Sequence, residues 1–225
     1  MCGRFTLAKK PKEIAERFQI SIPDDIPVPA FNAAPGQLLP VISRQDPDKL
    51  VLVRWGLSAP WLRSGSQLVI NARSETLASK RMFRELLETG RCLVPADGFY
   101  EWRKGGSRKQ PYRFTLQGEK IFAFAGLMQE QTNDDGEETL AFTILTTDAN
   151  ELVAGIHNRM PVILPAEAEK AWIEEGVAGA ALQELLRPYP AGQMHSYTVS
   201  PGVNNARVNH PGLIDPWKDN TLTLF

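Results

Sequence analysis

The chain contains, at residues 121–147, the stretch IFAFAGLMQEQTNDDGEETLAFTILTT, in which a polar segment separates two apolar runs. The runs Ile121–Leu127 and Leu140–Thr146 are rich in aromatic and β-branched residues, which favours strands. Asn, Asp and Gly at residues 133–136 are typical of a tight turn, so we predict that the two strands pair antiparallel. A sheet built from hairpins is therefore the starting point for the fold.

Further apolar runs, helical spacings and turns extend this pattern along the chain. Strands are predicted at Leu38–Ile42, Leu50–Leu57, Leu68–Ile70, Cys92–Val94, Tyr112–Leu116, Pro161–Leu164 and His195–Val199, and a second hairpin turn at residues 105–107. Apolar residues at helical spacing predict helices at Pro11–Ile20, Ser74–Glu88, Asp148–Val153, Ala166–Glu175 and Ala180–Arg187. Helices and strands do not alternate as βαβ units. We therefore expect an α+β fold, with one compact domain over residues 1–225 and a largely antiparallel, barrel-like sheet flanked by helices.

Composition narrows the class of protein. The 225 residues are 43% hydrophobic and carry a net charge of −1, so overall charge gives no argument for a polyanionic partner. The first 113 residues, however, hold 19 Lys and Arg against 11 Asp and Glu, while the remainder hold 6 against 15. Such asymmetry is a hint of a nucleic-acid or membrane surface.

The cysteine content indicates a reducing compartment, and the apolar runs are too short for a membrane span. Two cysteines and three scattered histidines supply neither a disulfide framework nor the spacing of a metal site, so we expect no metal and no cofactor. The N-terminus lacks the apolar region of a signal peptide, and the run Ile121–Met128 is too short to cross a bilayer. We expect a cytoplasmic protein without a membrane partner.

Cys2 is the residue with the most distinctive chemistry. Removal of the initiator Met1 would make it the N-terminal residue, with an α-amine and a thiol on adjacent carbons. Both groups have ordinary pKa values close enough to neutrality to supply nucleophile. An aldehyde attacked by the amine gives an imine, on which the thiol can close a five-membered thiazolidine ring. The alternative is an inert cysteine that stands at position 2 by chance.

Two further residues are candidates for proton transfer. Glu101 lies in the segment GFYEW at residues 98–102, where aromatic neighbours can desolvate a carboxyl group, although an exposed strand carboxylate fits the pattern as well. His157 lies in a loop before the strand that is predicted to begin at Pro161, where it can shuttle protons or simply bond to nearby backbone. His195 and His210 are assigned no role.

Polar and aromatic side chains suggest a surface for nucleic acid. Asn71 and Arg73 alternate along an extended segment and can enter one site, unless Asn71 ends the strand and Arg73 pairs with Glu75. Trp102 is the tryptophan best placed to stack on an unpaired base, whereas Trp55 is expected in the core. Other candidates for such a surface are Trp61, Arg4, Arg54, Arg63, Arg81, Arg84 and Arg103.

Four ordered motifs together resemble the SRAP family, named for SOS response-associated peptidases. They are CGR at residues 2–4, NARSET at 71–76, GFYEW at 98–102 and HNRMPV at 157–162, with WGL at 55–57 and VN at 203–204 as lesser agreements. The match spans most of the chain. The segment VNHP at residues 208–211 departs from the Asn-Asp-Gly-Pro run of the family, which affects only the C-terminal part of the comparison.

The resemblance implies an abasic-site sensor that acts in DNA damage repair. On this reading Cys2 captures the ring-opened abasic aldehyde in single-stranded DNA as a thiazolidine crosslink and shields the strand from cleavage. Cys2, Asn71, Glu101 and His157 match the reactive positions of the family, and Arg4, Arg73 and Arg159 match its DNA-contacting arginines. Strand cleavage as a lyase and self-processing as a peptidase are further implied activities. We expect a monomer that is associated with the nucleoid when bound to DNA.

Three other functions remain open from the sequence. An N-terminal cysteine also opens glutamine amidotransferases, but no glutamine-site motif such as Asn-Gly-Asn is present. A cysteine peptidase using Cys2 and His157 is the second alternative, and a non-covalent reader of DNA is the third. Glutamine hydrolysis, cleavage of a peptide other than Met1–Cys2, or DNA binding that is unchanged by loss of Cys2 would respectively favour them.

Overall fold

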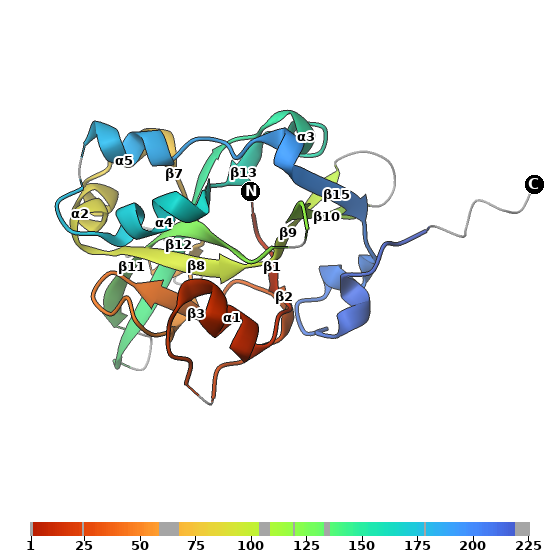
Figure 1. The fold of residues 1–225 in the computed structure, drawn as a ribbon, viewed down its shortest axis with the longest axis horizontal. Helices are drawn as coiled ribbons and strands as arrows, with labels where there is room; N and C mark the ends of the chain where they lie inside the picture. Colours follow the sequence, from red (N-terminus) through yellow and green to blue (C-terminus); the bar gives the residue numbers. More distant parts are fainter. Residues whose placement is uncertain are drawn as a thin grey trace, which may run out of the picture.

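Five strands close into a barrel at the centre of the molecule (Figure 1). The order around the barrel is β4, β3, β8, β11 and β12, and each of these strands pairs antiparallel with the next one in this order. A parallel pairing of β12 with β4 closes the ring. The five strands are β3 (Leu38–Ser43), β4 (Val51–Trp55), β8 (Arg91–Ala96), β11 (Phe122–Thr132) and β12 (Glu138–Asp148). Closure leaves fewer unpaired strand edges. The predicted α+β class with a largely antiparallel, barrel-like sheet is confirmed.

The structure is a computed structural model that describes residues 2–23, 25–58, 68–103, 109–118, 120–132, 136–177 and 179–218. The turn predicted at residues 105–107 and residues 133–135 of the other predicted turn lie outside the described residues. The strands on either side of each turn nevertheless pair antiparallel, β9 (Gly98–Arg103) with β10 (Gln110–Leu116) and β11 with β12, as the two hairpins require.

Short strands extend the ends of the barrel. β7 (Asn71–Arg73) pairs parallel with β12, β13 (Arg159–Pro161) pairs antiparallel with β12, and β14 (Ile163–Leu164) pairs with β11. Thr146 of β12 is therefore flanked by Arg73 on one side and Pro161 on the other. A separate two-stranded ribbon joins β5 (Leu57–Ser58) and β6 (Leu68–Val69).

A second sheet carries the N-terminal strand beside the barrel. Its strands, in spatial order, are β15 (Met194–Thr198), β10 (Gln110–Leu116), β9 (Gly98–Arg103), β1 (Phe5–Leu7) and β2 (Ala30–Ala33). All its pairings are antiparallel, and β1 also lies against β8 of the barrel. The sequence pattern did not predict β1 and β2, because three or four residues are too few to show a strand period.

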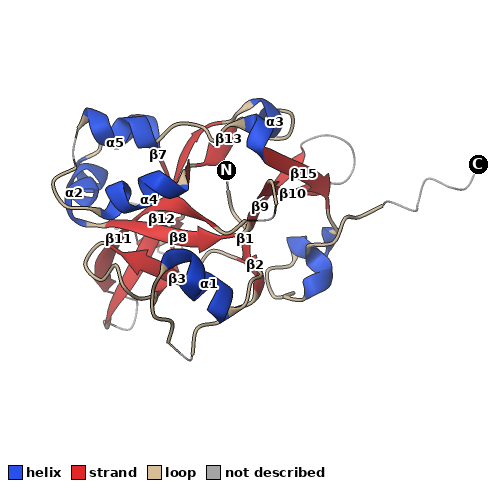
Figure 2. Ribbon diagram, viewed as in Figure 1, coloured by secondary structure: helices blue, strands red, loops and turns tan. Residues whose placement is uncertain are grey.

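Helices cover the outside of the strands, with α2, α4 and α5 grouped on one side of the barrel (Figure 2). The α-helices are α1 (Pro11–Phe18), α2 (Arg81–Thr89), α3 (Glu151–Ala154), α4 (Ala166–Ile173) and α5 (Ala180–Leu185). Single 3-10 turns occur at Ser74–Thr76, Ala191–Gln193, Pro201–Asn204 and Pro211–Leu213. None of the helices in the described part of the chain has the length and apolar character needed to cross a membrane.

Two predicted helices begin later than expected, and local hydrogen bonds explain both. The helix predicted at Ser74–Glu88 starts only at Arg81, because hydroxyl groups of Thr76 and Ser79 donate to nearby carbonyl oxygens and stabilise turns instead. The helix predicted from Asp148 starts at Glu151, because the side chain of Asn150 accepts the Val153 N–H at 2.9 Å and caps the helix there.

The barrel interior is filled by aromatic side chains. Trp55 is fully buried, lies 5.2 Å from the Phe5 ring between ring centroids, and donates its indole N–H to the Ile70 carbonyl at 2.9 Å. The prediction that Trp55 belongs to the core is confirmed. The same cluster contains Cys2, so the N-terminal residue of most chemical interest lies within the core.

A buried ion pair helps to hold β1 in its place within the second sheet. Asp97 and Arg113 are 3.2 Å apart between Oδ1 and Nη2, and their side chains are 2% and 4% exposed. The Asp97 carboxylate also accepts the Thr6 hydroxyl and, at 2.9 Å, the backbone N–H of Ala8. Tyr197 accepts from Arg113 at 2.7 Å and donates to Ile214 at 2.9 Å, which extends the network toward the C-terminus.

We predict that Asp97→Asn lowers the free energy of unfolding by about 3–5 kcal/mol, because the buried Arg113 guanidinium then lacks its counter-charge. The exposed Asp215→Asn is the matched control and should change little. Urea denaturation followed by tryptophan fluorescence measures both variants. Equal stability of the two variants would show that the ion pair is not what holds β1.

Candidate active site

Cys2 is carried into the core by the strand that follows it. The backbone N–H of Tyr100 in β9 donates to the Arg4 carbonyl at 3.0 Å, and Phe5 lies opposite Phe99 in the ladder. The Cys2 side chain is fully buried, and its Sγ donates to the Arg4 carbonyl at 3.6 Å. A residue at the start of the chain is thus held in a defined position, which a freely moving terminus would lack.

Asn71 forms a hydrogen bond with the backbone of Cys2. Its Nδ2 donates to the Cys2 carbonyl at 2.8 Å, while its Oδ1 is buried and accepts no hydrogen bond from the described residues. Asn71 begins β7 and lies opposite Ile144 of β12, so the alternative that it ends a strand is wrong. The structure therefore brings together two of the residues that the sequence singled out.

Glu101 adds a carboxylate beside the thiol. It lies in β9 and is 3% exposed, so the alternative of an exposed strand carboxylate is wrong. Burial, and secondly the negative charge of Glu101, raise the pKa of the Cys2 thiol well above its usual range. The thiol is thus a neutral group at physiological pH, with a nearby acid–base group to which a proton can pass during attack.

His157 lies at the same end of β12 as Asn71, just before β13. Its Nδ1 accepts the backbone N–H of Arg159 at 3.0 Å and also lies 3.3 Å from the Arg159 carbonyl oxygen. A bond to nearby backbone is therefore present, and it holds the half-buried ring in place.

Arg4 and Arg73 are cations without a carboxylate partner among the described residues. The Nε of Arg4 is buried without an acceptor there, and burial lowers the pKa of its guanidinium. Arg73 is exposed, and Glu75 pairs with Arg159 instead, so the alternative of an Arg73–Glu75 pair is wrong. Each arginine lies two residues along the chain from a member of the reactive cluster, Arg4 from Cys2 and Arg73 from Asn71.

Arg159 differs from these two arginines because its charge is already paired. Its guanidinium bonds to both carboxylate oxygens of Glu75, at 2.8 and 2.9 Å, and to Asp148 at 2.7 Å. Sequence reasoning missed Glu75 and Asp148 as partners, since they lie 84 and 11 residues from Arg159 and belong to no recognisable spacing. A DNA contact by Arg159 stays a prediction.

Trp102 is fixed at one edge and half-buried. Its indole N–H donates to Asn204 at 2.6 Å, and its side chain packs against the buried cluster of Tyr100, Val199, Val203 and Leu213. Its role as a stacking platform stays a prediction. Of the other candidates, Arg54 and Arg84 are exposed, Arg81 pairs with Glu85, Arg103 lies over the Tyr112 ring, and Trp61 and Arg63 lie outside the described residues.

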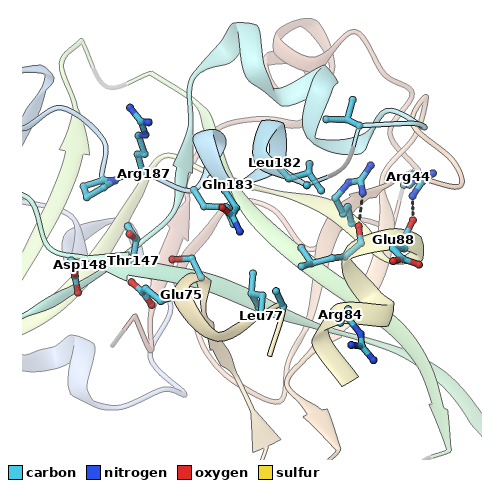
Figure 3. A pocket seen from close by; sticks show the side chains of 18 of the residues that line it. Arg44, Glu75, Leu77, Arg84, Glu88, Thr147, Asp148, Leu182, Gln183 and Arg187 are labelled. Carbon is cyan, nitrogen blue, oxygen red and sulfur yellow. Dashed lines mark hydrogen bonds between the residues drawn. The ribbon is translucent and has the colours of Figure 1, made fainter. Parts of the chain in front are cut away.

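A hollow of about 760 Å³ lies elsewhere, between α2 and α5 (Figure 3). Its wall combines leucines with charged residues, including Arg44, Arg84 and Glu88, and Cys2 is not among its lining residues. Glu75 and Asp148 lie on this wall, so the hollow reaches the partners of Arg159. The chemistry of the cluster around Cys2, and not the size of this hollow, defines the candidate site. In the described part of the chain, no group of three or more His, Cys, Asp or Glu residues is arranged to hold a metal ion.

Sequence comparison places the chain in a known family. The model of the family described as SOS response associated peptidase (SRAP) matches residues 1–206. The chain belongs to this family, as the motifs around Cys2, Asn71, Glu101 and His157 predicted.

Named relatives cover nearly the full chain. The abasic site processing protein YoqW of Bacillus subtilis is 42% identical over 222 residues, covering 96% of this chain and 99% of the relative. The abasic site processing protein YedK of Escherichia coli is 33% identical and covers 96% of this chain and all of its own. A crystal structure of a protein from Bacteroides thetaiotaomicron shares the fold with a TM-score of 0.85 at 28% identity, over 96% of this chain and 100% of that one.

We predict that Glu101→Gln speeds alkylation of Cys2 by iodoacetamide at about pH 8, because loss of the negative charge lowers the pKa of the thiol and raises the thiolate fraction. The rate is measured by peptide mass spectrometry on native protein, which separates Cys2 from Cys92. Glu130→Gln, an exposed change on β11, is the control and should leave the rate unchanged. A Glu101→Gln rate equal to that of the control would remove Glu101 from the surroundings of the thiol.

Proposed function

We propose that this protein captures abasic sites in single-stranded DNA through Cys2, as a covalent thiazolidine crosslink. The observation that carries the proposal is the cluster in which Asn71 holds the Cys2 carbonyl and Glu101 lies close enough to influence the buried thiol. Relatives that cover nearly the full chain bear the name abasic site processing protein, which supports the same substrate.

The proposed reaction uses both nucleophiles of an N-terminal cysteine. The α-amine nitrogen bonds to C1′ of the ring-opened sugar, and a proton moves from nitrogen to the aldehyde oxygen to give a carbinolamine. Loss of water leaves an imine. The Cys2 sulfur then bonds to the same carbon while its proton passes to the nitrogen, so one aldehyde and one aminothiol give one thiazolidine and one water.

The neighbouring residues have separate roles in this scheme. Glu101 accepts and returns the protons of carbinolamine formation, dehydration and ring closure. Asn71 fixes the Cys2 carbonyl, and its buried Oδ1 is an acceptor suited to the α-amine. His157, which is held by the bond from the Arg159 backbone N–H, assists opening of the sugar hemiacetal.

Ring closure also protects the strand. An imine acidifies the neighbouring C2′ proton and invites elimination of the 3′ phosphate, whereas a saturated thiazolidine has no such electron sink. Strand cleavage as a lyase and removal of Met1 by self-processing are secondary activities that the same cluster would support. The protein would act as a monomer, in the cytoplasm and on the nucleoid when bound to DNA.

The proposed DNA contacts are electrostatic and stacking contacts beside the nucleophile. Arg4 and Arg73 supply positive charge without a paired carboxylate in the described structure, which suits phosphate. Trp102 offers a half-exposed ring for an unpaired base.

We expect active protein to lack Met1 and to gain, on incubation with an abasic single-stranded oligonucleotide, the mass of the oligonucleotide less one water. Cys2→Ala should abolish the heat-stable crosslink yet retain a borohydride-trappable imine, because the α-amine remains while ring closure is lost. Intact mass spectrometry and denaturing gels measure both results. A stable crosslink in Cys2→Ala, or activity with Met1 retained, would contradict the thiazolidine; hydrolysis of glutamine by the wild type would favour an amidotransferase.

Arg73→Ala should weaken non-covalent binding to a single strand and lower the salt slope of the affinity by roughly 0.7, the value for one lost phosphate contact. The binding experiment uses an undamaged oligonucleotide and fluorescence anisotropy at several salt concentrations. Arg187→Ala, an exposed change on the hollow between α2 and α5, serves as the control. An unaltered slope in Arg73→Ala would remove Arg73 from the DNA surface.

A further inference from the structure

Trp102 lies on the opposite face of β9 from the residues around Cys2. Neighbouring residues of a strand point to opposite faces, and Glu101, the residue before Trp102, affects the Cys2 thiol. Trp102 instead packs with Tyr100 in a small cluster that is separate from the barrel core. One residue of a strand spans only about 3.3 Å, so the ring lies next to the reactive cluster along the strand without belonging to it.

The segment of residues 199–213 holds the ring from this face. Nε1 of Trp102 donates to Oδ1 of Asn204 at 2.6 Å, a short bond for an N–H donor. An indole has a single donor and no acceptor, so this bond uses the only polar atom of the side chain. Asn204 itself is exposed, whereas Val203 before it is fully buried in the small cluster. The acceptor therefore lies at the surface, on backbone that is anchored in the interior.

Asn32 of β2 fixes this segment in turn, and its side chain is only 2% exposed. Its Nδ2 donates to the carbonyl oxygens of Val203 at 3.3 Å and Asn205 at 3.0 Å, the two residues that flank Asn204 in sequence. The same nitrogen donates to the Val208 carbonyl at 2.9 Å. The segment lies beside β2 in Figure 1. The fold thus sets the position of the Asn204 amide through the backbone on both sides of it.

We propose that Asn204 is a positioning residue for DNA: it holds the Trp102 indole at a fixed angle, so that the half-exposed ring is ready to stack on the unpaired base beside the captured sugar. A ring without this bond turns about its side-chain torsions, and fixing it on binding then costs entropy. The stacking step rests on the proposed function, whereas the effect of Asn204 on the ring does not.

Indole N–H signals in nitrogen-15 NMR report the bond directly. The chain has five tryptophans, and the signal that is missing in Trp102→Phe is assigned to Trp102. We expect its hydrogen to exchange faster with solvent in Asn204→Ala, because the acceptor is lost. Asn204→Asp keeps an oxygen at the same place and should keep the wild-type exchange rate. Asn205→Ala is the matched control, because Asn205 is exposed and its side chain accepts from Arg207 and not from Trp102.

Binding to strands with and without bases separates stacking from a phosphate contact. One strand is oligothymidine, and the other has the same phosphates but tetrahydrofuran residues, which carry neither a base nor an aldehyde. We expect Asn204→Ala to weaken binding to oligothymidine by roughly 2- to 10-fold, the usual effect of one lost hydrogen bond, and to leave binding to the base-free strand unchanged. Trp102→Ala should show the same selectivity with a larger loss, roughly 5- to 150-fold for one stacked base.

Asn204→Asp tests rescue by a side chain that keeps the acceptor. Its negative charge lowers the affinity for both strands, but the ratio of the two affinities should stay at the wild-type value because the indole is still held. Asn205→Ala should also keep this ratio. Fluorescence anisotropy at several salt concentrations measures all variants, and Asn204→Ala should keep the wild-type salt slope, since no phosphate contact is lost.

Equal losses on the two strands in Asn204→Ala would overturn the proposal, because the residue would then act on phosphate or on the whole segment. A wild-type indole exchange rate in Asn204→Ala, or a wild-type ratio of affinities in Trp102→Ala, would overturn it as well. If the wild type forms no crosslink with an abasic strand while Asn204→Ala still loses binding to oligothymidine alone, the proposed covalent capture fails and the positioning of Trp102 stands.

Discussion

The buried pair of Asp97 and Arg113 is the interaction on which the site depends. Asp97 accepts from Thr6, the middle residue of the three-residue strand β1, and from Ala8, the residue that follows the strand. Such a short strand has few ladder bonds of its own. Fixing it in the low-dielectric interior places the preceding residues, including Cys2, against β9 and next to Glu101. A chain terminus ordinarily frays, and here a buried charge pair prevents this.

Burial of Cys2 has a chemical consequence. A thiol with a raised pKa reacts slowly with electrophiles in general, so the residue is protected from unwanted alkylation and oxidation. The proposed reaction needs little free thiolate, because attack by the α-amine comes first and the sulfur then closes a five-membered ring within the same residue. The negative charge of Glu101 disfavours the thiolate before the reaction. At ring closure the same carboxylate can accept the thiol proton, so it also assists attack by the sulfur.

The sequence predicted the barrel strands and the positions of the helices, because the repeat of apolar residues along these elements is recognisable. It missed β1 and β2, whose few residues show no period, and it started the helix after Arg73 seven residues early, since Thr76 and Ser79 favour turns. For the site, motif order identified Asn71 and Glu101, and the structure brings both to Cys2. The partners of Arg159 were beyond prediction, because Glu75 meets it only through pairings of β7 and β13 with β12.

The central claim is that Cys2 supplies both bonds to one sugar carbon. The most direct measurement is carbon-13 NMR of the crosslink formed with an abasic strand labelled at C1′. The account predicts a saturated C1′ signal coupled to the Cys2 nitrogen when the protein is labelled with nitrogen-15, together with loss of the free thiol. An unsaturated imine signal in the stable product, or a C1′ bonded to sulfur alone, would contradict it.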